Sequence, residues 1–487
     1  YGLTHDLGKA YTRWQDIIHE APYKEKPPHA MTGAAIFFSI VKKHFSDINS
    51  RLVVELTLDI LGHHGLLKDF AFDIWNEELI KEQLNNMDLD GISDFLYKNA
   101  GVTISLDDVN LDDWGNYVQQ ALKFAYKELK KNSKSNSNDW LFEQVSKSFL
   151  EKLVEADRVD AAGFAYVGKL EKKDIVRAID SIKRFCEDQE DTPLNRARQY
   201  CQKEAVNTVR ETIEHVLFKL NLPTGYGKTI TALRVALEAC LLAGLSRIIY
   251  IAPYINVLSQ STKVIKDVTG VNEVLEHHHL SFLREDNAKY TATEKILVFD
   301  VWHEKIITST FNKIFEAVFP KRANDLLRRS GMKNAFIILD EPQIVDYRDW
   351  ELFLGSLEKF ARDNNSKILL CTATCPNTKT VLQNDPVDLV KDVPKPKDRY
   401  MIHFNKEVFT KETLAQKVLN EKCKSLGVVL DTIRDAYEVF DEIRGETKKK
   451  LYFLSGLMNS HHKADVINNI RTDLEAGIEL IVVSTQM

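Results

Sequence analysis

Apolar residues recur at helical spacing through the first 190 residues of the chain. Clear examples are the runs Ala34–Val41 and Leu52–Leu61. A repeat of three to four residues is typical of amphipathic helices, whereas half-buried strands alternate every second residue. The stretch Glu187–Pro193 is acidic and ends in proline, which indicates a domain boundary. We therefore expect an all-α domain over residues 1–190.

The pattern then changes to short β-rich runs that alternate with helical segments. This alternation predicts a parallel sheet covered by helices, in a domain over residues 195–395. A second β/α pattern begins near residue 400, after the proline-rich stretch Asn384–Pro396, and predicts another α/β domain over residues 398–487. The expected strands are Val216–Leu222, Arg247–Ala252, Lys295–Phe299, Ala335–Leu339, Lys367–Cys371, and then Met401–Phe404, Leu426–Leu430, Lys450–Leu454 and Leu480–Ser484.

Length and composition are consistent with this division. At roughly 150 residues per domain, 487 residues correspond to about three domains. The net charge of −6 excludes a general polycation, so any nucleic-acid site must be local. No apolar run approaches the ~20 residues that span a bilayer, so we expect no membrane partner. The chain opens at Tyr1 and closes at Met487, just after an expected strand, so both ends are expected to lie inside folded domains, the second α/β domain being incomplete.

A glycine-rich loop, LPTGYGKT at residues 222–229, follows one expected strand and precedes a helix. Glycines let backbone N–H groups close around phosphate oxygens, and a helix N-terminus favours an anion. The lysine would neutralise the β- and γ-phosphates and the last threonine would hold Mg²⁺. The first position of the strict phosphate-loop pattern is Leu222 here instead of glycine. The expected nucleotide ligands are Thr224, Gly225, Gly227, Lys228 and Thr229.

An acidic pair, Asp340 and Glu341, follows the apolar run Phe336–Leu339. A buried parallel strand would deliver both carboxylates to its carboxyl end, where ligands of doubly wound sheets bind. We expect Asp340 to hold the Mg²⁺ shell and Glu341 to act catalytically by polarising the attacking water.

These segments resemble the motifs of superfamily 2 helicases. The order PTGYGKT, APYINVLSQ (252–260), DEPQ (340–343) and TAT (372–374) is similar to their first RecA-like domain, and VLDT (429–432) and STQ (484–486) to their second. Pro342 replaces the alanine usual in such acidic boxes, and the arginine-rich motif expected after Gln486 is not in the chain. The resemblance implies ATP with Mg²⁺ as cofactor and an upstream glutamine that reads adenine. Gln199 and Gln202 are both candidates.

Histidines and aspartates form an ordered set in the helical region. Adjacent ligands at helix ends, together with a distant aspartate, can surround two metal ions. A bridging carboxylate would let the two ions bind the attacking and leaving oxygens of a phosphodiester. Imidazole ligands favour transition metals over Mg²⁺. The candidate metal ligands are His5, Asp6, His29, His63, His64 and Asp157.

This set resembles the HD phosphohydrolase superfamily, which is named after its His-Asp pair. A further histidine usually precedes that pair and would lie before Tyr1. The resemblance implies two divalent transition-metal ions (Mn, Fe, Co or Ni), with Asp6 as the catalytic bridging ligand. Lys9 would contact phosphate, or lie on the surface. Asp160 competes with Asp157, and the Ala-Asp-Arg context favours Asp157; a purely structural role is the alternative for the whole set.

Three successive histidines and two basic pairs are further candidates for binding sites. His277–His279 have no other ligands at suitable spacing, so we expect a solvated loop there. Lys321-Arg322 and Arg328-Arg329 lie on an expected helix and would either touch a nucleic-acid backbone or form a solvated helix face.

An HD set followed by a superfamily 2 helicase core resembles the CRISPR-associated helicase-nuclease of type I systems. This resemblance implies an ATP-driven translocase on single-stranded DNA with a metal-dependent endo- or exonuclease that degrades foreign DNA in the cytoplasm. It also implies recruitment by the RNA-guided Cascade surveillance complex to the displaced strand. One alternative is a DNA or RNA helicase whose HD-like domain is inert or acts on nucleotides. Another is a nucleotide-gated binding protein that does not cut.

Overall fold

A computed structural model of the protein describes residues 1–19, 26–45, 47–132, 145–162, 168–278, 300–374, 385–394 and 401–485. The chain divides into two compact units, Tyr1–Lys397 and Asp398–Met487. The second unit begins at the boundary that the sequence predicts for the last domain.

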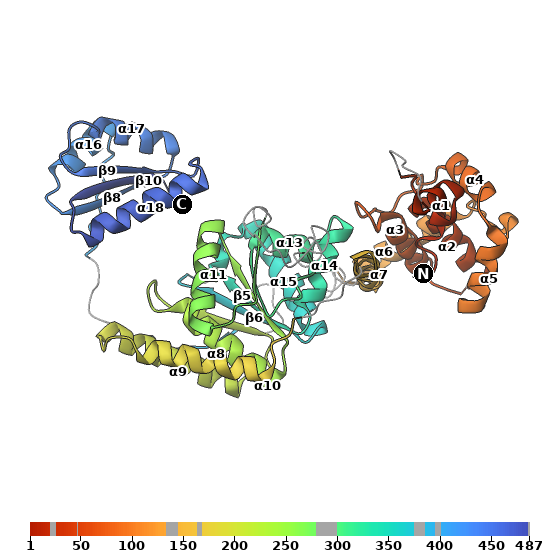
Figure 1. Ribbon diagram of the computed structural model, residues 1–487, viewed down its shortest axis with the longest axis horizontal. Helices are drawn as coiled ribbons and strands as arrows, with labels where there is room; N and C mark the ends of the chain where they lie inside the picture. Colours follow the sequence, from red (N-terminus) through yellow and green to blue (C-terminus); the bar gives the residue numbers. More distant parts are fainter. Residues whose placement is uncertain are drawn as a thin grey trace. The chain divides into compact units, whose positions relative to one another are not determined.

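The N-terminal part is helical, and its described residues up to 162 contain no strand. Helix α2 is buried along most of its length, because its apolar residues face helices on two sides. Helices α3 and α6 pack on one face, and α4 and α5 on the other (Figure 1). The helices are α1 (Thr12–Ile18), α2 (Ala30–His44), α3 (Ser50–Gly62), α4 (Glu77–Asn85), α5 (Leu89–Ala100), α6 (Trp114–Asn132) and α7 (Val145–Ala162), with short 3-10 helices η1 (Leu7–Ala10) and η2 (Leu106–Asp108).

Seven strands of the described residues form a parallel sheet in the order β3-β4-β2-β5-β6-β1-β7. The central strands are buried on both faces, as near-continuous apolar runs require. The strands are β1 (Leu217–Asn221), β2 (Arg247–Ala252), β3 (Val274–His277), β4 (Ile306–Thr310), β5 (Ala335–Asp340), β6 (Lys367–Thr372) and β7 (Val387–Asp388).

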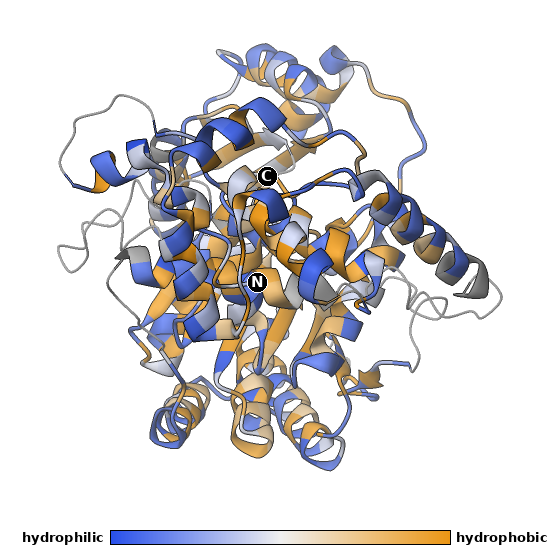
Figure 2. Cartoon of the chain, turned by 90° about the vertical axis from the view of Figure 1, so that its right-hand side faces the viewer, coloured by the Kyte–Doolittle hydropathy of each residue, from blue (hydrophilic) through white to orange (hydrophobic). Residues whose placement is uncertain are grey.

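Helices cover both faces of this sheet, and their hydrophobic sides, orange in Figure 2, turn toward the strands. One face is covered by α8 (Lys172–Glu187), α9 (Pro193–Glu211), α10 (Lys228–Ala243) and α11 (Ile255–Thr269). The other face is covered by α13 (Phe311–Val318) and α15 (Tyr347–Asp363), while α14 (Ala323–Met332) follows α13 and a 3-10 helix η5 spans Pro342–Ile344.

Helix α8, at the end of the predicted helical domain, joins the core of the sheet. Ile175, Ala178, Ile179 and Ile182 of α8 belong to the same core as α10 and β1. Helix α8 therefore packs with the sheet, although the prediction places it in the helical domain over 1–190. The helical periodicity of α8 is real, but periodicity does not tell which core the apolar face joins.

The second unit contains a parallel sheet in the order β8-β10-β9. Its elements are α16 (Lys411–Asn420), β8 (Ser425–Leu430), α17 (Ile433–Ile443), β9 (Lys450–Leu454), α18 (Ser460–Glu475) and β10 (Leu480–Thr485). Three of the four strands expected here are present. The prediction of a strand at Met401–Phe404 is wrong, because these residues pair with no strand of the described chain and Phe404 is 92% exposed.

Some predictions concern other segments. The expected strand Lys295–Phe299 lies outside the described residues. Within the proline-rich stretch Asn384–Pro396, Val387 and Asp388 form the edge strand β7, which pairs with β1. Among the described helices, none combines the length and the apolar character that crossing a bilayer requires.

Candidate functional site

The candidate metal ligands of the helical part converge on the carboxylate of Asp6. His29 Nε2 lies 3.1 Å from its Oδ1 and His63 Nε2 lies 3.7 Å from the same oxygen. His5 Nε2 is 3.3 Å from Oδ2, and Lys9 Nζ donates to Oδ2 at 2.6 Å. His64 joins the cluster through His29, with their Nε2 atoms 3.0 Å apart, and its Nδ1 lies 3.8 Å from Asp157 Oδ2. The structure thus brings together all six residues of the predicted metal set.

Four of the ligands sit at the ends of local elements. Asp6 precedes η1, His29 precedes α2, and His63 and His64 follow the last turn of α3. Two glycines allow these segments to touch. A Cβ on Gly8 would meet the carbonyl oxygen of His29 at 2.0 Å, and one on Gly33 would meet that of His5 at 2.7 Å. Glycine is therefore required at both positions, because any side chain would push the His-Asp segment away from α2.

Two imidazoles are oriented by backbone carbonyls. His63 Nδ1 lies 2.5 Å from the carbonyl oxygen of Ile60, and His5 Nδ1 lies 2.7 Å from that of Gly2. When each Nδ1–H donates to its carbonyl oxygen, the lone pair of Nε2 is available to bind a metal ion. Metal-bound histidines typically have their other ring nitrogen held in this way. Both Nε2 atoms are buried and have no hydrogen-bond partner within the described part of the chain.

The donor set fits two ions that share one carboxylate. Ligand atoms of Asp6, His29, His63 and His64 lie within 4.8 Å of one another, and so do those of His5, Asp6 and Asp157. Asp6 is common to both groups, as a bridging ligand must be. Asp157 belongs to a group, whereas the competing Asp160 is exposed one turn further along α7 and belongs to neither group among the described residues.

The electrostatics of the cluster favour Asp6, His29 and His64 in their metal-binding forms, whereas the neighbouring Asp6 raises the pKa of His5 against the effect of burial. Burial alone would raise the pKa of the Asp6 carboxyl, but His29, His5, His63 and Lys9 beside it hold that pKa well below its usual range. Burial lowers the pKa of His64 to about 3, and it also lowers the pKa of His29. An ionised carboxylate and neutral imidazoles are the forms that coordinate metal ions.

The glycine-rich loop lies at the carboxyl edge of the seven-stranded sheet. Gly225 and Gly227 have φ of 85° and 74°, which is left-handed backbone that favours glycine. Lys228 begins α10 and pairs with Glu341, which follows β5. Asp340 ends β5 and is buried. The loop and the acidic pair are therefore adjacent, as the predicted nucleotide site requires.

The DEPQ and TAT segments are also joined directly. Thr372 Oγ1, at the end of β6, donates to Gln343 Oε1 at 2.8 Å, and Gln343 Nε2 donates to Glu341 Oε2 at 2.6 Å. The backbone N–H of Thr374 donates to Thr372 Oγ1 at 2.9 Å. Glu341 itself has a left-handed φ of 51°. Because a non-glycine residue rarely adopts this conformation, the network holds Glu341 in a strained position at the site.

Two residues of this site have no motif that predicts them. Arg198 in α9 donates from Nε and Nη2 to the carbonyl oxygen of Gly225, at 2.9 and 2.6 Å, and so braces the loop. Tyr250 in β2 is fully buried and donates to Asp340 Oδ2 at 2.6 Å. Its hydroxyl lies 3.5 Å from Thr229 Oγ1. It therefore bridges the two predicted ligands of the Mg²⁺ shell.

Replacing Tyr250 by phenylalanine is expected to weaken Mg²⁺-dependent steps, because Asp340 loses the hydrogen bond that orients its carboxylate. Loss of a hydrogen bond that orients a metal ligand typically costs 10–100-fold in metal affinity or activity. We expect the Mg²⁺ concentration for half-maximal ATP hydrolysis to rise by roughly tenfold, and nucleotide binding without Mg²⁺ to stay unchanged. The matched control is Tyr347→Phe, whose ring is 82% exposed. An unchanged Mg²⁺ requirement in Tyr250→Phe would contradict the bridging role.

Both candidate adenine readers line one cavity of about 200 Å³ beside the loop. Gln199 and Gln202 face it from α9, Gly227 from the loop, and Phe185 and Cys186 from the end of α8. Gln199 Nε2 lies 3.4 Å from the Cys186 carbonyl oxygen. The cavity has the position that a base needs when its phosphates occupy the loop. It does not separate the two glutamines.

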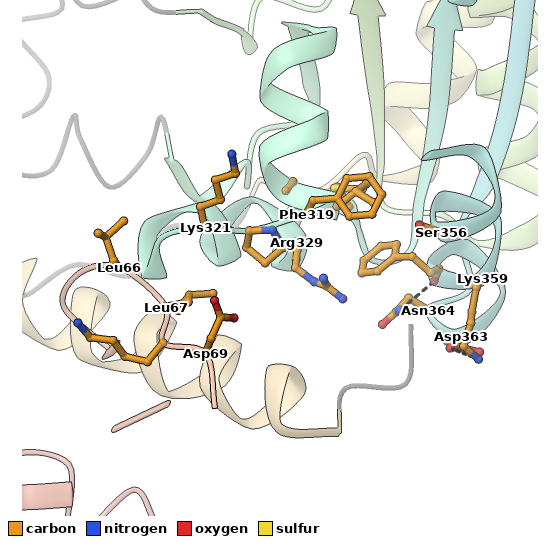
Figure 3. A pocket seen from close by; sticks show the side chains of 16 residues that line it. Leu66, Leu67, Asp69, Phe319, Lys321, Arg329, Ser356, Lys359, Asp363 and Asn364 are labelled. Carbon is orange, nitrogen blue, oxygen red and sulfur yellow. Dashed lines mark hydrogen bonds and ion pairs between the residues drawn. The ribbon is translucent and has the colours of Figure 1, made fainter. Parts of the chain in front are cut away.

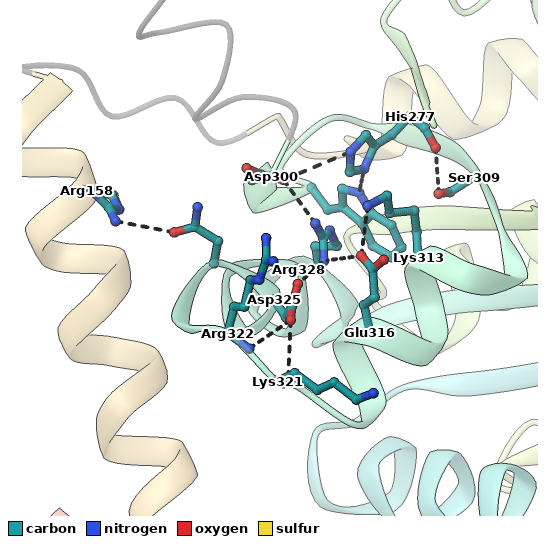
Figure 4. A network of polar contacts seen from close by, with 12 residues as sticks. Arg158, His277, Asp300, Ser309, Lys313, Glu316, Lys321, Arg322, Asp325 and Arg328 are labelled. Carbon is teal, nitrogen blue, oxygen red and sulfur yellow. Dashed lines mark hydrogen bonds and ion pairs between the residues drawn. The ribbon is translucent and has the colours of Figure 1, made fainter. Parts of the chain in front are cut away.

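The expectation for the three successive histidines is wrong for the two that are described. His277 ends β3, and both His277 and His278 are buried. Trp302 Nε1 donates to His277 Nδ1 at 2.7 Å, and Ser309 Oγ donates to its carbonyl oxygen (Figure 4). Burial lowers the pKa of His277 to about 2, so the ring is neutral. His279 lies outside the described residues.

The arginine pair of α14 also differs from both expectations. Arg328 is buried and pairs with Asp300, Glu316 and Asp325 at 3.0 to 3.2 Å (Figure 4). Arg329 lies 3.7 Å from Glu151 of α7 and stacks over the ring of Phe360. Guanidinium groups that are paired with carboxylates and largely shielded from solvent are not available to a phosphate backbone. Arg328 and Arg329 therefore form neither a solvated face nor a nucleic-acid contact.

The chain was compared with known proteins. The model of the DEAD/DEAH box helicase family matches residues 199–381. The CRISPR-associated nuclease/helicase Cas3 of Haloferax volcanii is 23% identical over 454 residues, which cover 81% of this chain and 47% of that protein. The chain thus spans about half the length of the curated relative that it matches.

Two solved structures have the same fold. T. fusca Cas3-ATP matches with a TM-score of 0.62 and T. fusca Cas3-AMPPNP with 0.59, each at 14% identity and covering 99% of this chain and 62% of theirs. At this identity the match concerns the fold alone. The resemblance that the sequence predicts is confirmed: the chain is similar to Cas3-type helicases, and it carries a DEAD/DEAH box helicase domain.

Proposed function

We propose that the chain is an ATP-driven translocase on single-stranded DNA with a metal-dependent HD nuclease in its N-terminal part. One observation carries the proposal. A histidine–aspartate cluster centred on a shared Asp6 and a phosphate loop facing an acidic pair occur in the same compact unit. The first is chemistry for a phosphodiester and the second is chemistry for a nucleoside triphosphate.

In the nucleotide site, Gly225 and Gly227 would present backbone N–H groups to the phosphates. The Lys228 ammonium group would leave its ion pair with Glu341 and contact the β- and γ-phosphates instead. Thr229 and Asp340 would hold Mg²⁺, with Tyr250 fixing Asp340. Glu341, released from Lys228, would accept a proton from the attacking water while Gln343 and Thr372 hold its second oxygen. Adenine would lie against Gln199 or Gln202.

In the HD site, Asp6 would bridge two ions, with His29, His63 and His64 on one side and His5 and Asp157 on the other. Mn, Fe, Co or Ni suits this imidazole-rich set. When bound, the ions supply a hydroxide at neutral pH and neutralise the scissile phosphate. Lys9, which pairs with Asp6 and is only partly exposed, would release its hydrogen bond to meet a phosphate oxygen.

The partners follow from the relatives. The Haloferax volcanii protein is named a CRISPR-associated nuclease/helicase. By this likeness we propose that the chain acts on the displaced single strand of foreign DNA, is recruited by an RNA-guided Cascade complex, and works in the cytoplasm.

The test of the proposal uses the full chain and a labelled single-stranded DNA without ATP. Addition of Mn²⁺, Fe²⁺, Co²⁺ or Ni²⁺ is expected to switch on cutting, and excess EDTA to abolish it. Added ATP and Mg²⁺ should then extend degradation into duplex DNA with a single-stranded end. Intact DNA with hydrolysed free nucleotides would favour a nucleotide phosphohydrolase. Intact DNA and nucleotides under every metal would favour a binding protein.

A further inference from the structure

We propose that helix α14 of the helicase domain positions the HD metal ligands His64 and Asp157. The proposal rests on the proposed function of the HD cluster. It names residues outside the cluster that hold two of the ligands in place. His64 and Asp157 lie on different segments of the helical part, and each segment is held by α14 from its own side.

The segment after His64 pairs with the start of α14 as a short antiparallel bridge. Leu67 N donates to the carbonyl oxygen of Lys321, and Ala323 N donates to that of Gly65, both at 2.9 Å. Gly65 follows His64 directly, so this bridge fixes the backbone next to a candidate ligand. Asp325 Oδ2 accepts hydrogen bonds from the backbone N–H groups of Lys321 and Arg322, at 3.2 and 2.9 Å (Figure 4). These bonds hold the backbone of the two residues in the position that the bridge requires.

The bridge is one of the contacts that support this turn. A cavity of about 630 Å³ lies along residues 66–69 and is closed on its far side by α13, α14 and α15 (Figure 3). Leu66 is 59% exposed, and Gly65 is exposed as well. Leu67 is partly buried and packs against the apolar cluster that α7 and α14 share, whereas the side chains beside the cavity provide little packing. The conformation of the turn therefore depends on α14, through the two hydrogen bonds and through the packing of Leu67.

The segment that carries Asp157 packs on the same helix. Leu150, Leu153 and Val154 of α7 form one apolar cluster with Ala323, Leu326 and Leu327 of α14. Glu151 is buried and pairs with Arg329 and with Lys333, just beyond the helix end. Arg158 Nη2, next to Asp157, donates to Asn324 Oδ1 at 3.3 Å (Figure 4). The face of α7 that carries these contacts runs from residue 150 to residue 158.

The two segments meet at the candidate metal site, where His64 Nδ1 lies 3.8 Å from Asp157 Oδ2. His64 belongs to one ligand group around Asp6 and Asp157 to the other. A shift of either segment on α14 would therefore change the distance between the two groups. Supports outside the ligand shell matter because their loss typically costs 10–100-fold in metal affinity.

The substitution Ala323→Pro tests this bridge. It removes the N–H that donates to Gly65, and proline fits the first position of a helix. The preceding Arg322 has φ −126° and ψ 154°, which is the backbone region that a residue before proline prefers. Lys172→Pro is the matched control, because Lys172 is the exposed first residue of α8 and Glu171 before it has φ −83° and ψ 156°.

Co²⁺ alone is titrated into the full chain and followed by its visible absorption, together with ATP hydrolysis and thermal unfolding. For Ala323→Pro we expect weaker binding of Co²⁺ at whichever of the two ion positions has the lower affinity: the Co²⁺ concentration that half-fills this position should rise by roughly tenfold. ATP hydrolysis should be preserved. Lys172→Pro should match the parent. Unchanged Co²⁺ binding in Ala323→Pro would overturn the proposal.

A second variant covers the case in which Ala323→Pro does not fold. Glu151→Gln keeps the side-chain shape and removes the charge that pairs α7 with Arg329 and Lys333. It is also expected to weaken Co²⁺ binding at the position of Asp157, and parent-like binding in this variant would count against the proposal. Failure of the HD assignment itself is recognised separately, because the parent would then bind no more Co²⁺ than Asp6→Ala.

Discussion

Replacing Asp6 by alanine is expected to remove both bound transition-metal ions and to lower single-strand cutting by at least about a hundredfold. Asp6 is the residue common to both ligand groups, and three imidazoles and Lys9 lie against its two oxygens. Without this carboxylate, the group of His29, His63 and His64 has no negative charge, and the other group keeps only Asp157 and His5. The measurement is paired on each purified protein: metal content by elemental analysis, and cleavage of a labelled single strand.

The control for this experiment is Asp160→Ala, which removes an exposed carboxylate from the same helical part and should leave metal content and cutting unchanged. His63→Ala and His64→Ala each remove one ligand of several, so high metal concentration should partly restore cutting in them. ATP hydrolysis stimulated by single-stranded DNA should survive in every variant. If Asp6→Ala holds two ions and cuts at the parent rate, the HD assignment is wrong.

Much of the nucleotide site could be predicted because its parts are short and local. A glycine-rich turn between strand and helix, and an acidic pair after an apolar strand, both place their side chains at the carboxyl edge of a parallel sheet. The register of the sheet agrees with this: Asn221 pairs with Thr372, and Asp340 with Cys371. The sequence order of these motifs therefore carries most of their spatial arrangement.

The metal cluster could be predicted for a different reason. His5 and Asp157 are far apart in sequence, and no spacing rule brings them together. Their convergence was expected only because the ordered set resembles a family. What the resemblance does not show is Gly33, whose hydrogen atom lets α2 approach the backbone of His5. A glycine inside a helix carries no signal of which distant segment touches it.

The predictions that failed, and the site residues that no motif indicates, depend on contacts between segments. Tyr250 has the pattern of a core residue, and only the neighbouring strand β5 gives its hydroxyl a partner. His277 belongs to a run of histidines that is typical of a loop. It nevertheless ends a strand, where Trp302 and Ser309 donate hydrogen bonds to it. Apolar residues at 401–404 have the composition of a strand but find no pairing partner in the described chain. Composition and period describe a segment, whereas these outcomes depend on what packs against it.

Replacing Lys228 by alanine is expected to abolish ATP hydrolysis, with a fall of at least about a hundredfold, because the charge on the β- and γ-phosphates is then uncompensated. In the absence of nucleotide Lys228 pairs with Glu341, so the substitution also leaves that carboxylate without its cation. Glu341 has its pKa raised by burial and lowered more strongly by Lys228, Gln343 and Thr372. Losing Lys228 should therefore raise that pKa. A higher pH would restore the ionised Glu341 but not the missing positive charge at the phosphates, so pH cannot restore the rate.

The same variant tests whether the proposed nuclease activity is independent of ATP hydrolysis. Metal-dependent nicking of single-stranded DNA without ATP should remain at the parent rate, because the Asp6 cluster shares no residue with the phosphate loop. Degradation of duplex DNA, which needs translocation, should disappear. Lys183→Ala on the exposed side of α8 is the control and should retain all three activities. If folded Lys228→Ala loses nicking as well, the nuclease depends on the nucleotide state of the helicase, and α14, which contacts the HD part and leads into β5 with Asp340, is the structural connection to examine.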